Sequence, residues 1–262
     1  MTTGKNFVIN KQNAHLYAHA IAYRVRDELK TLNRKGIVLG MSGGVNCSVV
    51  ATLCRLINIP THLIMMPYGD DMSKSNSQSH AMELIERFHF PHHTFNIKPD
   101  VDAQTISTDA EIEESINLLA RANILPRVRM THLYHFADVH NYLVAGTCNL
   151  SKRTVGYFTK WGEGACDFNP LSFLTKREVY ILARFLNVPD SILSAGLLES
   201  QADESELGIT YSQIDDYLLS GTSGTYSIDV SIENKALASK HKFVEVPTFN
   251  SKISYTAERT TS

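Results

Sequence analysis

A glycine-rich run between an expected strand and an expected helix holds the residue types best suited to chemistry. Its sequence is Gly-Met-Ser-Gly-Gly-Val-Asn-Cys-Ser, residues 40–48. Glycines let backbone N–H groups approach an anion, and a helix N-terminus adds favourable partial charge. Ser42 and Ser48 could add hydroxyl donors. The run has neither the Gly-Lys-Ser/Thr ending of a Walker A loop nor a Gly-x-Gly-x-x-Gly pattern. We interpret it as a phosphate-binding loop, with a tight connection that binds no ligand as the alternative.

The elements that position this loop alternate between short apolar runs and segments of helical periodicity. The expected strands are 37–41, 61–66, 94–97 and 142–145, and the expected helices are 18–32, 49–57, 79–88 and 118–138, the last interrupted by Pro126. This order predicts an α/β fold in which helices flank both faces of a parallel β-sheet. The loop then lies beyond the carboxyl ends of the strands, where such folds bind ligands.

Two capping boxes mark later helices. Thr175 and Glu178 begin one helix, and Thr210 and Gln213 begin another that continues to residue 219. A small, polar loop is expected at 220–227, and a polar tail from about residue 251. No repeat or long linker divides the chain, so we expect a single domain over residues 1–262.

Composition narrows the classes of function. The 262 residues carry a formal net charge of -2, which disfavours a nucleic-acid partner. No apolar run reaches the roughly 18 residues of a membrane span, and the first residues lack a signal core. We therefore expect a cytoplasmic protein without a membrane partner. The four cysteines form no Cys-x-x-Cys pair and predict no zinc or redox site.

The loop resembles the pyrophosphate loop, Ser-Gly-Gly-x-Asp-Ser, of enzymes that cleave ATP between the α and β phosphates. Asn46 stands for the aspartate and Cys47 for the second serine. A second block narrows the resemblance, with Gly-Thr-Cys-Asn at 146–149 and Gly-Tyr-Phe-Thr-Lys-Trp-Gly-Glu-Gly at 156–164. Together they resemble ammonia-dependent NAD synthetase over roughly residues 13–250. The resemblance implies a Rossmann-like fold of the adenine nucleotide alpha hydrolase type.

Other segments match the same family. Asn123 with residues 127–130 is similar to its substrate-contacting helix. Residues 194–197 followed by 201–208 look like its mobile phosphate-side loop. His241, Lys242 and Pro247 look like its C-terminal signature.

The resemblance implies a two-step amidation. ATP adenylates the nicotinate carboxylate of deamido-NAD and releases pyrophosphate, and ammonia then displaces AMP. The absence of a glutaminase domain implies free ammonia as the nitrogen donor. Family members are homodimers whose substrate site borrows residues across the interface, so a homodimer is expected.

Residue roles follow from the matched motifs. The implied ATP contacts are Gly40, Ser42, Gly43, Gly44, Asn46, Cys47, Ser48, Met65, Thr147, Lys176 and Ser194. Among them, Ser42, Lys176 and Ser194 are the expected catalytic contacts. The implied substrate contacts are Arg127, Lys160, Asp167, His241 and Lys242.

Plainer interpretations stand beside these roles. Lys160 could be a solvated surface lysine, and Asp167 could be a turn residue. Lys176 could merely occupy the first turn of its helix, although lysine is electrostatically poor there. A histidine cluster, His89, His92 and His93, matches no motif and is expected at the surface or at a strand edge.

The chain departs from the family pattern at the expected magnesium site. Asn46 and Lys152 replace two metal-binding carboxylates, and Glu163 is the nearest family-like carboxylate that remains, a weak ligand by itself. Magnesium prefers carboxylate oxygen, and a protonated lysine repels it. Met65 also stands where many members carry an arginine that packs against adenine.

Questions of activity, substrate and class stay open. The Lys152 ammonium takes over part of the metal's role and amidation survives, or the chain is a nucleotide-binding paralogue without catalysis. The substrate is deamido-NAD or nicotinate mononucleotide. A tRNA-modifying relative, suggested only by Cys47 in the loop, is the most distant.

Overall fold

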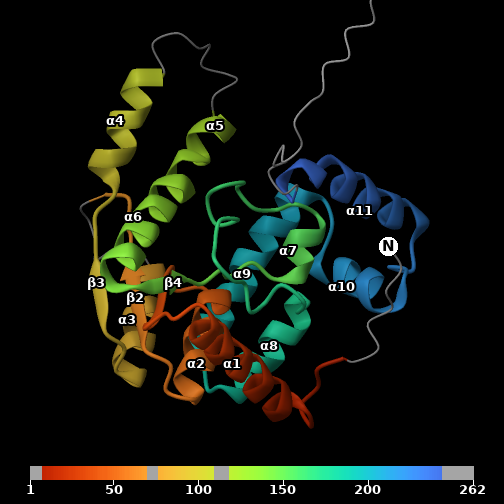
Figure 1. Cartoon of the computed structure of the whole chain (residues 1–262). Helices are drawn as coiled ribbons and strands as arrows, with labels where there is room; N and C mark the ends of the chain where they lie inside the picture. The colour runs from red at the N-terminus through yellow and green to blue at the C-terminus, as the bar shows by residue number, and fades with distance from the viewer. Residues whose placement is uncertain (1–7, 70–75, 109–117, 244–262) are drawn as a thin grey trace, which may run out of the picture.

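Four short parallel strands form the sheet at the centre of the fold, in the order β3-β2-β1-β4 (Figure 1). The computed structural model describes residues 8–69, 76–108 and 118–243. The strands are β1 (Gly36–Gly40), β2 (Thr61–Met65), β3 (His92–Thr94) and β4 (Tyr142–Val144). In the register, Val38 of β1 lies opposite His62 of β2 and Val144 of β4.

Helices cover both faces of the sheet, as the alternation of elements predicts. Ile37 and Leu39 of β1 face one core, which is built with α1 (Ala14–Thr31), α2 (Val45–Leu56), α3 (Asn76–Phe88) and α8 (Lys176–Phe185). Val38 faces the other core, with α4 (Lys98–Thr108) and α6 (Ile124–His140). Burial of each aliphatic side chain stabilises the fold by about 1.5–3 kcal/mol. The alternation of side chains along β1 therefore determines which helices pack on each face.

A third cluster of helices packs beyond the sheet on the side of α8 (Figure 1). It contains α7 (Leu150–Thr154), α9 (Asp190–Leu207), α10 (Tyr211–Ser220), α11 (Tyr226–Ala238) and a 3-10 turn at Lys240–Lys242. Its core joins Val155, Ile209, Ile214 and Ile232. The short α5 (Leu118–Ala122) precedes α6.

Both predicted capping boxes are confirmed. The side chains of Thr175 and Thr210 accept a hydrogen bond from the third residue of their helices, and Glu178 and Gln213 reach back to the N-cap N–H groups. Glu178 is fully buried, and its second carboxylate oxygen accepts the backbone N–H of Ile9 at 3.0 Å. The start of the described chain is thus fastened to α8.

Three expected elements differ from the structure. The strand expected at 94–97 is β3 at 92–94, because the Asn96 side chain accepts the N–H of Lys98 and turns the chain into α4. Pro126 does not divide a helix, since it is the third residue of α6 and the break falls at Asn123. The loop expected at 220–227 is shorter, because α10 ends at Ser220 and α11 begins at Tyr226.

The expected phosphate-side loop at 201–208 is wrong in its secondary structure. These residues complete α9, and Gly208 ends that helix in the left-handed conformation, with φ 69°. The polar tail and Pro247 lie outside the described residues. Within the described part of the chain, no helix combines the length and apolar character that crossing a bilayer requires.

Candidate active site

The site lies where the order in which the strands are added to the sheet reverses. β1 is followed in sequence by β2 on one side, while its neighbour on the other side is β4. The segments that follow β1 and β4 therefore meet, and the Asn46 amide donates to the Thr147 carbonyl at 2.8 Å. Such a switch point at the carboxyl ends of parallel strands is where open α/β sheets bind ligands.

A cleft of about 1370 Å³ opens at this point. It collects residues from the loop after β1, the segment after β4, and helices α6, α7, α8 and α9. The expected site residues that line it are Gly40, Ser42, Gly44, Asn46, Cys47, Met65, Thr147, Lys152, Glu163, Lys176 and Lys242.

The loop presents the N-terminus of α2 to the cleft. Gly43 has φ 83°, and a Cβ there would lie 1.9 Å from the Ser77 carbonyl oxygen, so only glycine fits. Gly44 is the N-cap of α2, and its N–H donates to Ser42 Oγ at 3.4 Å. The first N–H groups of a helix have no partner within the helix, so this end of the cleft is suited to an anion.

Two loop side chains, Ser48 and Cys47, make hydrogen bonds within the loop. The Ser48 hydroxyl donates to the Gly44 carbonyl at 2.8 Å, and the Cys47 thiol donates to the same oxygen at 3.1 Å. Ser48 is fully buried and is absent from the cleft lining, as is Gly43. Both side chains brace the first turn of α2, so here any phosphate contact would come from backbone N–H groups and from Ser42.

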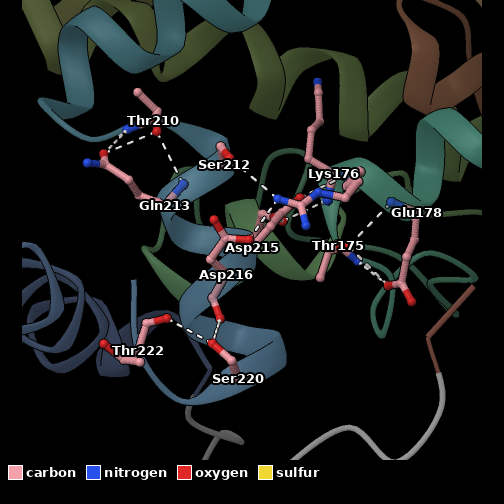
Figure 2. Close-up of polar contacts among 12 residues, drawn as sticks. Thr175, Lys176, Glu178, Thr210, Ser212, Gln213, Asp215, Asp216, Ser220 and Thr222 are labelled. Atoms are coloured by element: carbon pink, nitrogen blue, oxygen red, sulfur yellow. Dashed lines mark hydrogen bonds and ion pairs between the residues drawn. The ribbon is translucent and has the colours of Figure 1, made fainter. Parts of the chain in front are cut away.

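Lys176 is positioned by hydrogen bonds to the first turn of its own helix. The Lys176 N–H donates to Ser151 Oγ, and the Arg177 N–H donates to Asp215 Oδ2, each at 2.8 Å. Figure 2 shows Asp215 and Thr175 beside this N-terminus, with α10 supplying the aspartate. The Lys176 ammonium lies 5.7 Å from the centroid of the Tyr180 ring and 5.1 Å from that of Tyr211.

This environment lowers the pKa of Lys176 to about 8. Burial is the main cause, and the nearby Lys152 ammonium adds to it. Two lysines therefore point into one cleft close enough to repel each other. An anion bound between them would relieve that repulsion.

Lys152 enters the cleft from α7 and is held by α9. Its Nζ lies 2.9 Å from Asp203 Oδ2, with the two side chains 25% and 19% exposed. The same carboxylate oxygen accepts the Tyr211 hydroxyl at 2.8 Å. The Asn149 side chain accepts the Lys152 N–H at 3.0 Å and so caps α7.

The side chains present do not fit the expected magnesium site. Asn46 uses its amide on Thr147, and its Oδ1 accepts from Asn149 at 3.4 Å. Burial lowers the pKa of Arg129 and of Lys242, and in both the nearby Glu163 carboxylate opposes that shift, so cations already surround Glu163. Across residues 8–69, 76–108 and 118–243, no three His, Cys, Asp or Glu side chains are grouped to hold a metal ion.

The other expected substrate residues lie outside the cleft lining and tie neighbouring segments together. Lys160 Nζ donates to the His241 carbonyl at 2.7 Å, and Arg127 Nε donates to the Lys160 carbonyl at 3.3 Å. Asp167 accepts the Val144 N–H at 2.7 Å and the Tyr134 hydroxyl at 3.3 Å. Lys242 does line the cleft, and its ammonium donates to two carbonyls of the segment 156–158.

Ser194 is exposed on α9 and is not among the cleft-lining residues. Its expected contact with the triphosphate stays a prediction. The same applies to the substrate roles of Arg127, Lys160, Asp167 and His241.

Several cleft residues were given no individual role from the sequence, although most of them lie in segments expected at the site. Arg129 lines the cleft and donates from Nε to the Met66 carbonyl at 3.1 Å. Tyr157 lines it as well, and its hydroxyl donates to Glu206 at 2.6 Å. Glu199, Asp203 and Glu206 line it from α9. Their spacing of four and then three residues places them on one helix face, a signal that is visible in the sequence once the segment is assigned as helix.

Fold and site together define an α/β protein of Rossmann-like fold, with a glycine-rich loop at the switch point of a parallel sheet, the place where nucleotide-binding folds hold their ligands. The sequence profile of NAD synthase matches residues 17–255. The chain belongs to the NAD synthase family, and it is a ligase.

Individual relatives agree. An NH(3)-dependent NAD(+) synthetase from Carboxydothermus hydrogenoformans is 38% identical over 230 residues, covering 85% of this chain and 93% of that protein. Among solved structures, NMN synthetase from Francisella tularensis aligns with a TM-score of 0.82 and 33% identity, covering 93% of this chain and 100% of that one. NH3-dependent NAD synthetase from Campylobacter jejuni aligns with a TM-score of 0.73 and 25% identity, covering 92% and 99%.

Proposed function

We propose that this chain amidates the nicotinate carboxylate of deamido-NAD, using ATP and ammonia and giving NAD, AMP and pyrophosphate. The observation that carries the proposal is a phosphate-type loop at the switch point of a chain that belongs to the NAD synthase family. The curated relative over most of the chain bears the same activity in its name.

The reaction has two covalent steps. A carboxylate oxygen of the nicotinate attacks the α-phosphorus of ATP, the bond to the β-phosphate oxygen breaks, and pyrophosphate leaves. Ammonia then attacks the carbonyl carbon of the acyl-adenylate, loses a proton, and AMP leaves with the former carboxylate oxygen. The protein's task is to hold the carboxylate in line with the leaving oxygen and to stabilise the charge that develops there.

The chain's own groups suit that task. The N-terminus of α2 offers backbone N–H groups at one end of the cleft, and the Lys176 ammonium lies in the same cleft. Positive charge beside a leaving pyrophosphate is the stabilisation that phosphoryl chemistry needs. Arg129 and Lys242 line the part of the cleft near Glu163 and suit an anionic substrate group. The side chains that would hold magnesium are replaced by Asn46 and Lys152, so the charge on the phosphates must be offset by the chain's own cationic groups.

Oligomeric state and location rest on the family resemblance. We propose a homodimer in which the partner completes the dinucleotide site, in a cytoplasmic setting. Sedimentation with and without dinucleotide tests the first part, since a chain that stays monomeric in both conditions would contradict it.

A second candidate substrate is nicotinate mononucleotide. The observation that favours it is the alignment with the NMN synthetase structure, at a TM-score of 0.82 against 0.73 for the Campylobacter jejuni NAD synthetase. Met65 lines the cleft where many members carry an adenine-packing arginine. Turnover of the two nucleotides by one preparation decides between them through the ratio of their kcat/KM values.

The deciding experiment measures AMP and pyrophosphate release from ATP with ammonium and either nucleotide. Nucleotide-dependent AMP supports the amidation. Absence of AMP from a folded protein that binds ATP would contradict it and leave a nucleotide-binding protein. In that case Asn46→Asp combined with Lys152→Glu separates a degenerate enzyme, which gains activity, from a chain with another role.

A further inference from the structure

The cleft contains matched positive and negative groups that face each other. Positive groups come from the N-terminus of α2, from Lys152 and from Lys176. Negative groups come from one face of α9, as Glu199, Asp203 and Glu206. A polyanion that enters the cleft must therefore compete with carboxylates of the protein itself.

Two of these pairings are geometrically explicit. Lys152 Nζ and Asp203 Oδ2 are 2.9 Å apart, and neither side chain is more than a quarter exposed. A Cβ built on Gly44 would lie 3.4 Å from Glu199 Oε2. The Glu199 carboxylate thus lies beside the N-terminus of α2, the end of the helix that favours a phosphate group.

α9 is packed tightly against the phosphate loop. A Cβ on Gly196 would lie 2.4 Å from Val45 Cγ2 and 2.8 Å from the Tyr180 hydroxyl, so the helix approaches α2 as closely as glycine allows. Further along α9, the Tyr211 hydroxyl and the Lys152 ammonium both contact Asp203. The carboxylate face is therefore held against the cleft at both ends.

Lys152 also has a fixed place relative to the loop. Asn149 accepts the Lys152 N–H and donates to Asn46 Oδ1, so one side chain connects the start of α7 to the start of α2. The Lys152 ammonium lies 5.2 Å from the centroid of the Tyr157 ring, within the range of a cation–π contact. Its charge is close enough to Lys176 to lower the pKa of that group.

We propose that Lys152 is a polyphosphate-binding residue, and that it exchanges its Asp203 partner for a phosphate group of ATP when the nucleotide binds. Its ammonium then supplies positive charge beside the loop. Asn46 and Lys152 stand there in place of the two carboxylates that would bind a divalent cation. Asp203 holds the ammonium ready and competes with the phosphate for it. The inference rests on the proposed use of ATP, but not on turnover.

The competing interpretation is a purely structural ion pair between α7 and α9. The two interpretations predict different signs for the two partners. If Lys152 binds phosphate, its removal weakens polyphosphate binding, whereas removal of the Asp203 charge removes a competitor. If the pair only stabilises the fold, both substitutions act in the same direction.

The experiment measures binding of inorganic tripolyphosphate and of ATP to the full chain by calorimetry in EDTA at pH 7.0. We expect the unaltered protein to bind both, and Lys152→Met to bind both about 10- to 100-fold more weakly, the range for a charge-assisted hydrogen bond. Lys152→Arg should stay within about threefold, because it keeps the charge. Asp203→Asn keeps an acceptor for Tyr211 and should bind equally or more tightly. Lys35→Met, an exposed position before β1, is the matched control.

Three outcomes would overturn the proposal. One is failure of the unaltered protein to bind either polyanion in EDTA. Another is Lys152→Met binding as tightly as the unaltered protein. The third is Asp203→Asn weakening binding as much as Lys152→Met does. Should Lys152→Met not fold, the comparison of Lys152→Arg with Asp203→Asn decides. AMP release is read separately, so a protein that binds tripolyphosphate without amidating either nucleotide contradicts the proposed reaction and leaves the role of Lys152 intact.

Discussion

Asp215 of α10 accepts the backbone N–H of Arg177 at 2.8 Å and thereby caps α8, the helix that begins with Lys176. The other carboxylate oxygen accepts the Ser151 hydroxyl, and that serine in turn accepts the N–H of Lys176. Burial raises the pKa of Asp215, and these hydrogen bonds oppose the shift. The Asp215 carboxylate thus orients the N-terminus of α8, which carries Lys176.

Asp215→Ala should destabilise the protein by about 2–3 kcal/mol, because two donors at a buried helix N-terminus lose their acceptor. It should also raise the apparent Kd for ATP, since the helix N-terminus that carries Lys176 is no longer held by Asp215. Urea unfolding and ATP calorimetry measure the two effects. Asp216→Ala, which removes an exposed pair with Arg177, is the control. Equal effects of the two variants would show that Asp215 has no special role.

ATP binding should take up protons near pH 8 and above. The pKa of Lys176 is lowered to about 8 by burial and by Lys152, so the free protein loses this charge as pH rises through about 8. A phosphate partner favours the charged form and restores it. Calorimetry in two buffers of different ionisation enthalpy should show little uptake at pH 7 and several tenths of a proton near pH 8.5. Lys176→Arg should abolish the uptake, and its persistence in that variant would assign the proton to another group.

Part of the candidate site could be predicted from the order of strands and helices in the sequence. The strand-glycine-helix order correctly placed the glycine-rich loop between β1 and α2, beside the cleft, because glycines at a tight turn are readable from residue type. Ser48 could not be placed in the same way. It is the fourth residue of α2, and its hydroxyl hydrogen-bonds the carbonyl four residues earlier instead of a ligand.

The α9 face was missed for a different reason. Its assignment as a loop came from resemblance, while Leu193, Gly196, Ser200 and Leu207 are buried at helical spacing. Their contacts with α2 and α10 arise from tertiary packing, which local sequence does not specify. The mismatch at the family's magnesium site is visible in the sequence itself, because Asn46 and Lys152 are residue types that cannot act as carboxylate ligands.

Gly43→Ala should destabilise the protein by about 2–4 kcal/mol and abolish ATP binding. It combines a left-handed φ of 83° with a Cβ 1.9 Å from the Ser77 carbonyl oxygen. Gly224→Ala is a matched control, because Gly224 has φ 85° and open space around its Cβ position. That control should cost only about 1 kcal/mol. The difference between the two free energies of unfolding isolates the clash, and no difference would refute it.

The histidines at the β3 edge of the sheet predict that the protein loses stability in acid. His92 and His93 are exposed on this strand, as expected for the histidine cluster, and the rings of His62 and His93 are hydrogen-bonded at 2.7 Å. Burial, followed by the neighbouring histidines, lowers the pKa of His62 to about 4. The folded state therefore resists a proton that the unfolded chain takes up below about pH 6.5.

Stability from this group is complete above pH 6.5 and is lost as pH falls towards 4. The loss should be about 1–2 kcal/mol after discounting for the partly exposed ring. His62→Gln should flatten the dependence of the unfolding free energy on pH between 7.5 and 5, while the exposed His135→Gln should not. Parallel slopes for the two variants would count against His62 as the source.

The hydrogen bond from Ile9 to Glu178 makes the beginning of the described chain part of the machinery that holds Lys176. The same buried carboxylate caps α8 and anchors the N-terminal segment, so disturbance at one end is transmitted to the other. Trimming a recombinant protein through Ile9 would leave Glu178 with one acceptor oxygen short of a donor in a dry environment. The first residue of a recombinant protein is therefore expected to affect its affinity for nucleotide as well as its expression.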